Sequence, residues 1–455
     1  MGAPFTSVLI ANRGEIAVRV ERACLELGLR PVLIASEADR AGRARPDEGG
    51  PLAIGPSAPS RSYLNQAAIL LAARVTGAEA VHPGYGFLSE NADFAEAVEA
   101  AGLIFIGPPA SAIRIMGDKI AAKRAMMAAG VPCVPGPGEP LPERVEAVRA
   151  IAGEIGYPVI IKAAGGGGGR GMRVVRESAE VADAVAITRE EARRAFGRPE
   201  LYMEKFLEHP RHVEFQVLCD NHGNAVWVGH RDCSVQRRHQ KVVEEAPAPG
   251  IAPELAERIG ARCAEACRQI GYRGVGTFEF LYENGEFYFI EMNTRLQVEH
   301  PVTEMTAGVD LVHEQLRVAQ GAVLEASRFA GTARGHAFEC RVNAEDPETF
   351  VAAPGRITAV RFPSGPGIRV DTHVSAGYRV SPYYDSLIAK VIVHAPTRED
   401  AVRRMQVALS QTRIEGIATN LPLHERIFAD PDFVRGCVDI HHLEKRLREE
   451  PRGEA

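Results

Sequence analysis

Between Glu291 and Glu299, strongly polar residues alternate with less polar ones. The odd positions are Glu291, Asn293, Arg295, Gln297 and Glu299, and the even positions are Met292, Thr294, Leu296 and Val298. Because an extended chain points successive side chains to opposite faces, this segment could direct two carboxylates, two amides and a guanidinium to one place. Such groups are ligands for metals and anions. The alternative is an edge strand with a solvated face, but the apolar run 287–290 just before it indicates buried sheet.

Five consecutive glycines, residues 165–169, separate two predicted strands at 158–163 and 172–175. No helix and no Gly-Lys-Ser/Thr ending follows them, so the segment is predicted to be a hairpin with an oversized tip and not a P-loop. Each glycine costs about 0.5–1 kcal/mol in backbone ordering. That cost is understandable in a flap whose N–H groups close on phosphate oxygens. Lys162 before the tip favours this interpretation over a plain flexible loop.

Potential cations are concentrated at residues 231–241, where Arg231, Arg237, Arg238, His239 and Lys241 occur in a chain with a net charge of −6. The run interrupts strand-like segments at 213–218 and 225–228. We interpret it as a loop that faces an anion. A solvated surface is the alternative.

The N-terminal region has the pattern of a βαβ unit, with strands at 7–11 and 31–35 around a helix at 15–27. This pattern predicts a parallel sheet. The first turn, 12–15, lacks the three glycines of a dinucleotide fingerprint, which disfavours NAD. A turn-rich loop at 82–87 is followed by Ser89, the expected N-cap of a helix ending at Gly102.

The 455 residues are 45% hydrophobic and 25% charged, enough for two to four domains with real cores. The negative net charge disfavours nucleic-acid binding. No apolar run approaches the roughly 18 residues of a membrane helix, and no signal peptide is recognisable. The eight cysteines are scattered without the spacing of a zinc site, which is typical of a reducing, cytoplasmic compartment.

Six ordered motifs together make the chain similar to the biotin carboxylases of the ATP-grasp superfamily. They are Ile10–Ala17, His82–Asn91, Met116–Lys119, the glycine tip, Arg231–Glu245 and Glu291–Pro301. The resemblance extends from about Val8 to about Leu447. One stretch, Ala41–Leu52, departs from the family pattern.

The resemblance implies an α/β fold in three parts. These are an N-terminal Rossmann-like domain at 1–115, an ATP-grasp core at 116–330 and a C-terminal α+β domain at 331–447, followed by a charged tail at 448–455. Within the core, a mobile glycine-rich lid is expected at about 134–207.

The resemblance also implies the ATP-dependent carboxylation of biotin N1′ by bicarbonate, through carboxyphosphate. ATP would be bound by Lys119, Lys162, Gly166, Gly167, Gly168, Glu204, Lys205, Leu207, His212, Gln236, His239 and Leu281. Mg²⁺ or Mn²⁺ would be held by Glu279, Glu291 and Asn293. Bicarbonate would be bound by Lys241, Arg295, Gln297, Val298 and Glu299, with Glu299 as its base. Biotin would contact Tyr85 and Arg341, whose guanidinium would stabilise the biotin enolate. The catalytic residues would be Glu299, Arg341, Arg295 and Lys241.

No Ala-Met-Lys-Met-type turn for biotin attachment is present, so biotin is expected on a separate biotin carboxyl carrier protein. The resemblance further implies carboxyltransferase subunits and a homodimer, as in acetyl-CoA carboxylase or a related acyl-CoA carboxylase. Two other ATP-grasp enzymes are disfavoured. One like carbamoyl-phosphate synthetase would need a second ATP-grasp half, for which 455 residues leave no room, and a multifunctional carboxylase is expected to continue into carboxyltransferase and biotinyl domains. From another class, the alternative is a non-catalytic nucleotide-sensing or scaffold subunit.

Two geometric predictions follow. Fully extended, Glu291 to Glu299 would span about 26 Å, too long for one site, so the chain should bend after Asn293. A two-residue turn at Asn284 and Gly285 would place Glu279 and Glu291 on opposite faces. We therefore predict an odd-length loop, 283–285, with Gly285 left-handed.

Overall fold

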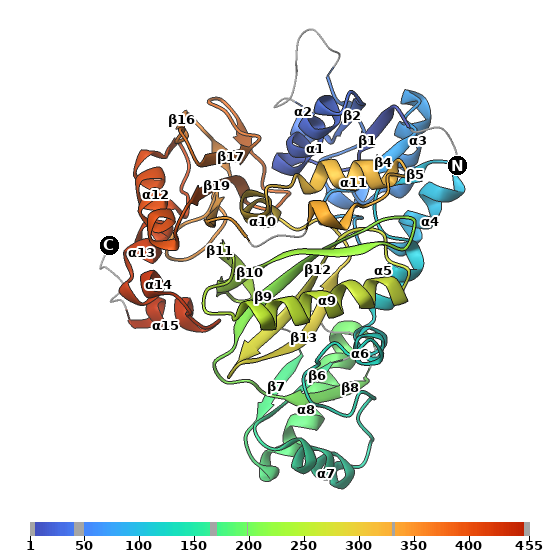
Figure 1. Ribbon diagram of the computed structural model, residues 1–455, viewed down its shortest axis with the longest axis vertical. Helices are drawn as coiled ribbons and strands as arrows, with labels where there is room; N and C mark the ends of the chain where they lie inside the picture. The colour runs from blue at the N-terminus through green and yellow to red at the C-terminus, as the bar shows by residue number, and fades with distance from the viewer. Residues whose placement is uncertain (1–4, 41–49, 164–170, 198, 330–332, 450–455) are drawn as a thin grey trace.

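The structure is a computed structural model that describes residues 5–40, 50–163, 171–197, 199–329 and 333–449 (Figure 1). The glycine tip and most of the 41–52 segment lie outside these ranges. The N-terminal elements are β1 (Ser7–Ile10), α1 (Gly14–Glu26), β2 (Arg30–Ala35), α2 (Glu37–Arg40), β3 (Leu52–Ala53), α3 (Gln66–Thr76), β4 (Ala80–His82), α4 (Ala92–Ala100), β5 (Ile104–Phe105) and α5 (Ala110–Gly117). The strands form a parallel sheet in the order β3-β2-β1-β4-β5, which confirms the predicted βαβ unit.

One helix cap in this region was predicted wrongly. The N-cap of α4 is Asn91, whose side chain accepts a hydrogen bond from Phe94 N, and not Ser89. Both residue types cap helices well. Ser89 instead lies in the turn before the helix, where its backbone N–H donates to Gly86 O.

A small antiparallel sheet, in the order β7-β6-β8, forms the lower part of the molecule in Figure 1. Its region contains α6 (Lys119–Ala128), α7 (Val145–Ile155), β6 (Val159–Ala163), β7 (Met172–Val175), α8 (Val181–Phe196) and β8 (Leu201–Lys205). The pairing of β6 with β7 confirms the predicted hairpin. Val148, Ile161 and Val185 belong to a core that α7, α8 and the sheet share.

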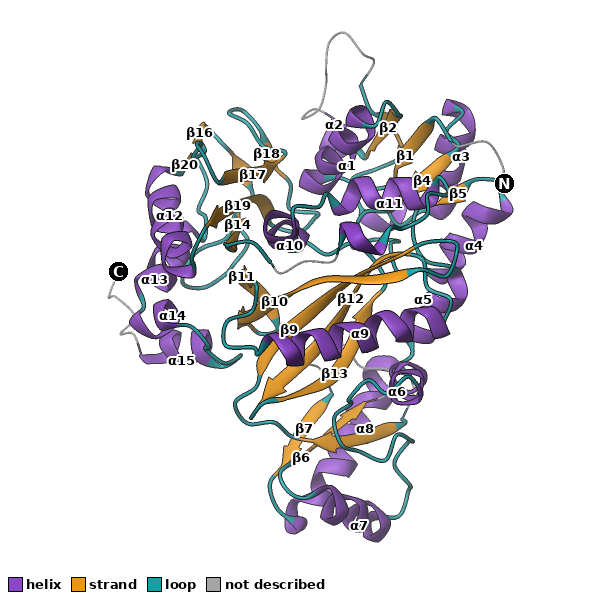
Figure 2. Ribbon diagram, viewed as in Figure 1, coloured by secondary structure: helices purple, strands orange, loops and turns teal. Residues whose placement is uncertain are grey.

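A large antiparallel sheet, in the order β13-β12-β9-β10-β11-β14-β19-β17, crosses the middle of the molecule (Figure 2). The strands from this part of the chain are β9 (Arg211–Cys219), β10 (Ala225–Arg237), β11 (Gln240–Ala246), β12 (Gly274–Glu283) and β13 (Glu286–Asn293). The helices of the same part are α9 (Pro253–Gln269), α10 (His300–Ala307) and α11 (Leu311–Ala319). The sheet continues into the C-terminal region because β11 pairs with β14.

The cation run is not a loop, contrary to our interpretation. Residues 231–237 belong to β10, and β11 follows after a two-residue turn at Arg238 and His239. Arg231 is completely buried, where its guanidinium binds Glu214 at 2.9 Å and Gln297 at 2.6 Å. The charge of Arg231, which contributed to the loop interpretation, is therefore neutralised across the sheet.

The C-terminal elements surround their own apolar core. They are β14 (His336–Asn343), β15 (Gly355–Arg356), β16 (Ala359–Arg361), β17 (Ile368–Thr372), β18 (Arg379–Val380), β19 (Leu387–Ala395), α12 (Arg398–Gln411), β20 (Arg413–Glu415), α13 (Leu421–Ala429), α14 (Pro431–Arg435) and α15 (His442–Glu449). Phe338, Val391, Met405 and Phe428 are buried in this core. Within the described ranges, no helix is long and apolar enough to span a membrane. The eight cysteines are free thiols.

A glycine in α9 gives a first testable prediction. A Cβ atom at Gly260 would lie 2.2 Å from the ring of Trp227 on β10. Gly260→Ala should therefore lower the free energy of unfolding by about 1–3 kcal/mol, as other overpacked cores do. Gly153 of α7 is the matched control, because it is exposed and a Cβ there meets nothing within 4 Å. Gly153→Ala should raise the free energy by about 0.4–1 kcal/mol. Urea unfolding of both variants tests this, and equal stability of Gly260→Ala and the parent would contradict it.

Candidate active site

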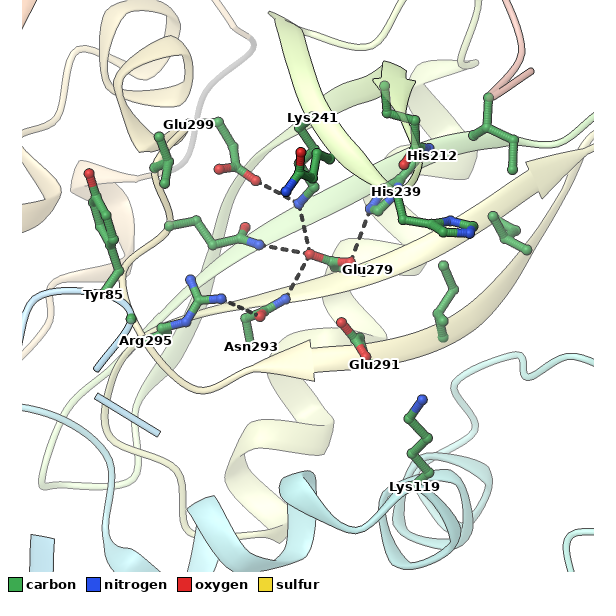
Figure 3. Close-up of a pocket in the computed structure, with 18 of the residues that line it drawn as sticks. Tyr85, Lys119, His212, His239, Lys241, Glu279, Glu291, Asn293, Arg295 and Glu299 are labelled. Carbon is green, nitrogen blue, oxygen red and sulfur yellow. Dashed lines mark hydrogen bonds and ion pairs between the residues drawn. The ribbon is translucent and has the colours of Figure 1, made fainter. Parts of the chain in front are cut away.

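A cleft of about 930 Å³ opens between the N-terminal sheet, the small antiparallel sheet, the large sheet and the C-terminal region. Predicted site residues that lie in the described ranges line it: Tyr85, Lys119, Lys162, Glu204, Lys205, Leu207, His212, Gln236, His239, Lys241, Glu279, Leu281, Glu291, Asn293, Arg295, Gln297, Val298, Glu299 and Arg341. Figure 3 shows ten of them directed into the cleft. Gly166, Gly167 and Gly168 lie outside the described residues.

Three carboxylates form a row across neighbouring strands. Glu214 on β9 is opposite Glu279 on β12, and Glu279 is opposite Glu291 on β13. Side chains directly opposite each other share a face of the sheet. This row places Glu279 and Glu291 side by side, as a shared metal would require.

The loop length predicted for the hairpin between these carboxylates is wrong. The turn between β12 and β13 has two residues, Asn284 and Gly285, and not three. Both residues have positive φ, 52° and 85°, so the left-handed conformation of Gly285 is confirmed. Ile290 is an extra residue between the pairs 279–291 and 280–289, and it brings the side chain of Glu291 to the same face of the sheet as that of Glu279. Such a β-bulge adds one residue to one strand and thereby shifts the register.

Lys241 is the central cation of the cleft. Its ammonium group lies 2.8 Å from Glu279 and 2.7 Å from Glu299 (Figure 3). It is also within hydrogen-bond contact of Glu214. Burial disfavours the charge on Lys241, but these carboxylates outweigh burial and raise its pKa well above the usual range. Although burial opposes ionisation of Glu279, Lys241 and His212 hold its pKa well below normal. This cluster is therefore a network of ionised groups.

Glu291 has the surroundings expected of a metal ligand. Within the described residues its carboxylate forms no hydrogen bond or ion pair, and burial and the charge of Glu279 raise its pKa. A divalent cation with oxygen ligands would stabilise the ionised form. Asn293 donates to Glu279 at 2.7 Å and accepts from Arg295 at 2.9 Å. Its side-chain amide therefore lies next to the Glu279 carboxylate. The donor set fits Mg²⁺ or Mn²⁺.

Basic side chains line the part of the cleft beside the small sheet. Lys162 and Lys123 bind the two oxygens of Glu204 at 2.7 and 2.9 Å. Lys119 projects towards Glu291 (Figure 3), and burial lowers its pKa. Burial opposes protonation of His212, but Glu279 and Glu214 outweigh burial and raise its pKa to about 9. This concentration of cations suits a polyphosphate.

The chain bends after Asn293, as predicted. β13 ends there, and α10 begins at His300. We refer to the connecting residues 294–299 as the anion loop. Arg295 is fixed in this loop by an ion pair with Glu90 at 2.9 Å, and Gln297 donates to Glu279 at 2.8 Å.

Glu299 lies at the end of the anion loop, between two cations. One oxygen is 2.7 Å from Lys241 and the other is 2.9 Å from Arg341. Burial favours the neutral form of Glu299, but Lys241 and Arg341 outweigh burial and lower its pKa to about 2. Arg341 is held in turn by Glu244 at 2.6 Å. The ionised Glu299 can therefore accept a proton at neutral pH.

Several carboxylates that hold the predicted residues in place were not predicted: Glu15, Glu90, Glu214 and Glu244. A signal for Glu214 was present, because His212, Glu214 and Gln216 alternate with Val213, Phe215 and Val217 on β9. That period-two pattern places the polar side chains on one face. We find no comparable local signal for Glu90 or Glu244.

The mixed α/β fold and this arrangement of cations, paired carboxylates and a buried base define a ligase of the ATP-grasp type. Family models match almost the whole chain: the biotin carboxylase N-terminal domain at 4–113, the ATP-binding domain of the carbamoyl-phosphate synthase L chain at 118–327, and the biotin carboxylase C-terminal domain at 339–445. The chain belongs to the biotin carboxylase family.

Individual relatives agree over nearly their full length. The biotin carboxylase of Haemophilus influenzae is 60% identical over 97% of this chain and 98% of that protein. The Campylobacter jejuni biotin carboxylase, solved as a β,γ-ATP complex, has a TM-score of 0.91 and 45% identity over 97% and 99% of the two chains. The biotin carboxylase domain of 2-oxoglutarate carboxylase from Hydrogenobacter thermophilus, solved as a dimer with MgADP, ADP and bicarbonate, has a TM-score of 0.89 and 46% identity over 99% and 100%.

Proposed function

We propose that this cleft binds ATP and bicarbonate and transfers a carboxyl group to N1′ of biotin on a separate carrier protein. ATP is converted to ADP and phosphate. The observation that carries the proposal is the position of Glu299, a buried base in contact with both Lys241 and Arg341. It joins the groups assigned to bicarbonate with those assigned to biotin.

Phosphoryl transfer depends mainly on positioning and charge neutralisation. Lys119 and Lys162 would bind the phosphates, and Glu204 would release Lys162 as ATP enters. Glu279, Glu291 and Asn293 would hold Mg²⁺ or Mn²⁺, which supplies charge neutralisation at the phosphates. The other nucleotide contacts would be Lys205, Leu207, His212, Gln236, His239 and Leu281. The glycines at 166–168 would close over the phosphates as part of a lid.

Bicarbonate is a weak nucleophile and must lose a proton as its oxygen attacks the γ-phosphorus. Arg295, Gln297, Val298 and Lys241 would bind the anion beside Glu299. When Lys241 turns from Glu299 to the anion, Glu299 loses one of its two cations. Its proton affinity then rises at the moment when it must accept the proton.

The ureido nitrogen of biotin is reactive only as the enolate, so it must lose its N1′ proton. The phosphate that leaves carboxyphosphate as the carboxyl group is transferred would accept that proton. Arg341 would bind the enolate oxygen, because a fixed guanidinium stabilises the charge that develops there. Tyr85 would border the ureido ring. Its hydroxyl is oriented by a hydrogen bond to Glu15.

We assign domains at 1–115, 116–330 and 331–447, with a lid at about 134–207 and a tail at 448–455. The chain would act in the cytoplasm as a homodimer, with a biotin carboxyl carrier protein and carboxyltransferase subunits. The acceptor would be acetyl-CoA or another acyl-CoA, and the 2-oxoglutarate carboxylase relative makes a keto acid a further candidate.

The test is ATP hydrolysis by the purified chain. We expect ADP release that depends on bicarbonate and is stimulated by free biotin, and carboxybiotin detected by mass spectrometry. A carrier-borne biotin should be a better substrate than free biotin, because the carrier contributes to positioning. Nucleotide binding without turnover would instead support a sensing or scaffold subunit, which the intact Glu299, Lys241 and Arg341 do not favour.

A further inference from the structure

Lys390, on β19, is a buried cation that the proposed mechanism does not use. Its side chain is 0% exposed, and burial of a lysine without compensation is costly. The ammonium group donates to Val298 O at 2.8 Å and forms ion pairs with Glu15 at 3.1 Å and Asp371 at 3.8 Å. These partners come from the anion loop, α1 and β17, so one side chain joins three parts of the structure.

The contact with Val298 fixes a peptide plane of the anion loop. The Val298 carbonyl and the Glu299 N–H belong to the same planar unit. Holding the carbonyl therefore fixes the orientation of this plane, which contains the Cα atom from which the Glu299 side chain projects. A loop residue assigned to bicarbonate and the base next to it are both positioned by this hydrogen bond.

The contact with Glu15 extends to the biotin side. Oε1 of Glu15 lies 3.1 Å from Lys390 and also accepts the hydrogen bond from the Tyr85 hydroxyl. The side chain of Glu15 is 1% exposed, so water does not compete for this oxygen. A continuous chain of contacts thus runs from Tyr85 through Glu15 and Lys390 to Val298.

Lys390 also lies directly opposite Arg341 on the neighbouring strand β14. Like charges in such a pair repel each other. Here each cation has its own carboxylates, Glu244 and Glu299 for Arg341, and Glu15 and Asp371 for Lys390. The arrangement retains a buried cation beside a half-buried one, which a purely structural core would not require.

We infer that Lys390 is a positioning residue that sets the anion loop and Tyr85 relative to each other, and thereby aligns bicarbonate with biotin. The inference rests on the proposed function. It does not involve the lysines assigned to ATP, which lie beside the small sheet.

The test is Lys390→Met, which keeps the aliphatic stem and removes the ammonium group. We expect the KM for bicarbonate to rise at least tenfold and biotin-stimulated turnover to fall at least tenfold, while the KM for ATP stays within twofold. A merely structural role would lower the amount of active enzyme and leave the KM values unchanged. The double variant Lys390→Met with Glu15→Gln removes one positive and one negative charge, and Asp371 keeps its ion pair with Arg369 at 2.7 Å. The same KM values are measured on it if the single variant does not fold.

Arg398→Met is the matched control. Arg398 lies in the same region, pairs with the buried Glu245 at 2.7 Å and does not line the cleft. It should lose stability without a change in the KM for bicarbonate. Bicarbonate KM values within twofold of the parent in both Lys390 variants would overturn the inference. A parent chain without bicarbonate-dependent hydrolysis would instead overturn the proposed function.

Discussion

Glu299→Gln is expected to lower bicarbonate-dependent ATP hydrolysis by about 10²–10⁴-fold, the usual contribution of a general base. The amide has nearly the same shape as the carboxylate but cannot accept the proton. Folding should survive, because Lys241 keeps Glu214 and Glu279, and Arg341 keeps Glu244. The measurement is ADP release at saturating ATP, with ATP affinity determined separately and expected to stay within threefold.

Glu245→Gln is the control for this substitution. Glu245 is also a buried carboxylate between cationic partners, His336 and Arg398, at 2.7 Å each. It lies outside the cleft, so its neutralisation should lower stability and change the turnover rate less than threefold. A Glu299→Gln variant whose rate stays within tenfold of the parent would exclude Glu299 as the base.

The positions of the cleft residues could be predicted because they occur in short motifs with distinctive spacing. Glu291, Asn293, Arg295, Gln297 and Glu299 alternate over nine residues, and the bend after Asn293 followed from the length of an extended chain. The paired strands 158–163 and 172–175 were equally visible, because glycines at a hairpin tip are a strong local signal.

The errors occurred where long-range partners override local pattern. The two-residue turn at Arg238 and His239 has positive φ at both positions, 48° and 64°. Turns of this kind favour Asn-Gly, so two cationic residues there indicated a longer loop. Its strain is located beside the cleft, as is common at functional sites. The bulge at Ile290 could not be predicted either, because an Asn-Gly hairpin has the same sequence signal with or without a bulge.

The contact between Glu15 and Lys390 could not be predicted from the sequence. Glu15 and Lys390 are 375 residues apart in sequence and 3.1 Å apart in the structure. No local periodicity connects them, since each lies in an element with its own apolar pattern. Glu15, Glu90 and Glu244, which orient predicted residues, could therefore be identified only with the fold.

Arg341→Met should separate the two halves of the proposed reaction. Biotin-stimulated turnover is expected to fall by about 10²–10³-fold, since a fixed donor at a developing oxyanion has an effect of that size. Hydrolysis that depends on bicarbonate alone should fall much less, because Arg341 is assigned to biotin and not to the bicarbonate anion. Arg341→Lys should restore little, since a lysine side chain ends in a compact point charge and lacks the rigid planar fork of donors that a guanidinium presents.

The free energy of unfolding of Arg341→Met should also depend on pH. Burial raises the pKa of Glu244 to about 7 even though Arg341 opposes this shift, so removal of Arg341 should raise the pKa further. A carboxyl group with a raised folded-state pKa loses stability as the pH rises from its unfolded value towards its folded value. Urea unfolding of Arg341→Met should therefore show lower stability at pH 8 than at pH 6, and Glu244→Gln added to it should remove that difference. Equal losses of activity in the two hydrolysis assays would contradict a role for Arg341 in the biotin half alone. A free energy of unfolding that does not change between pH 6 and pH 8 would show that Glu244 does not depend on Arg341 for its charge.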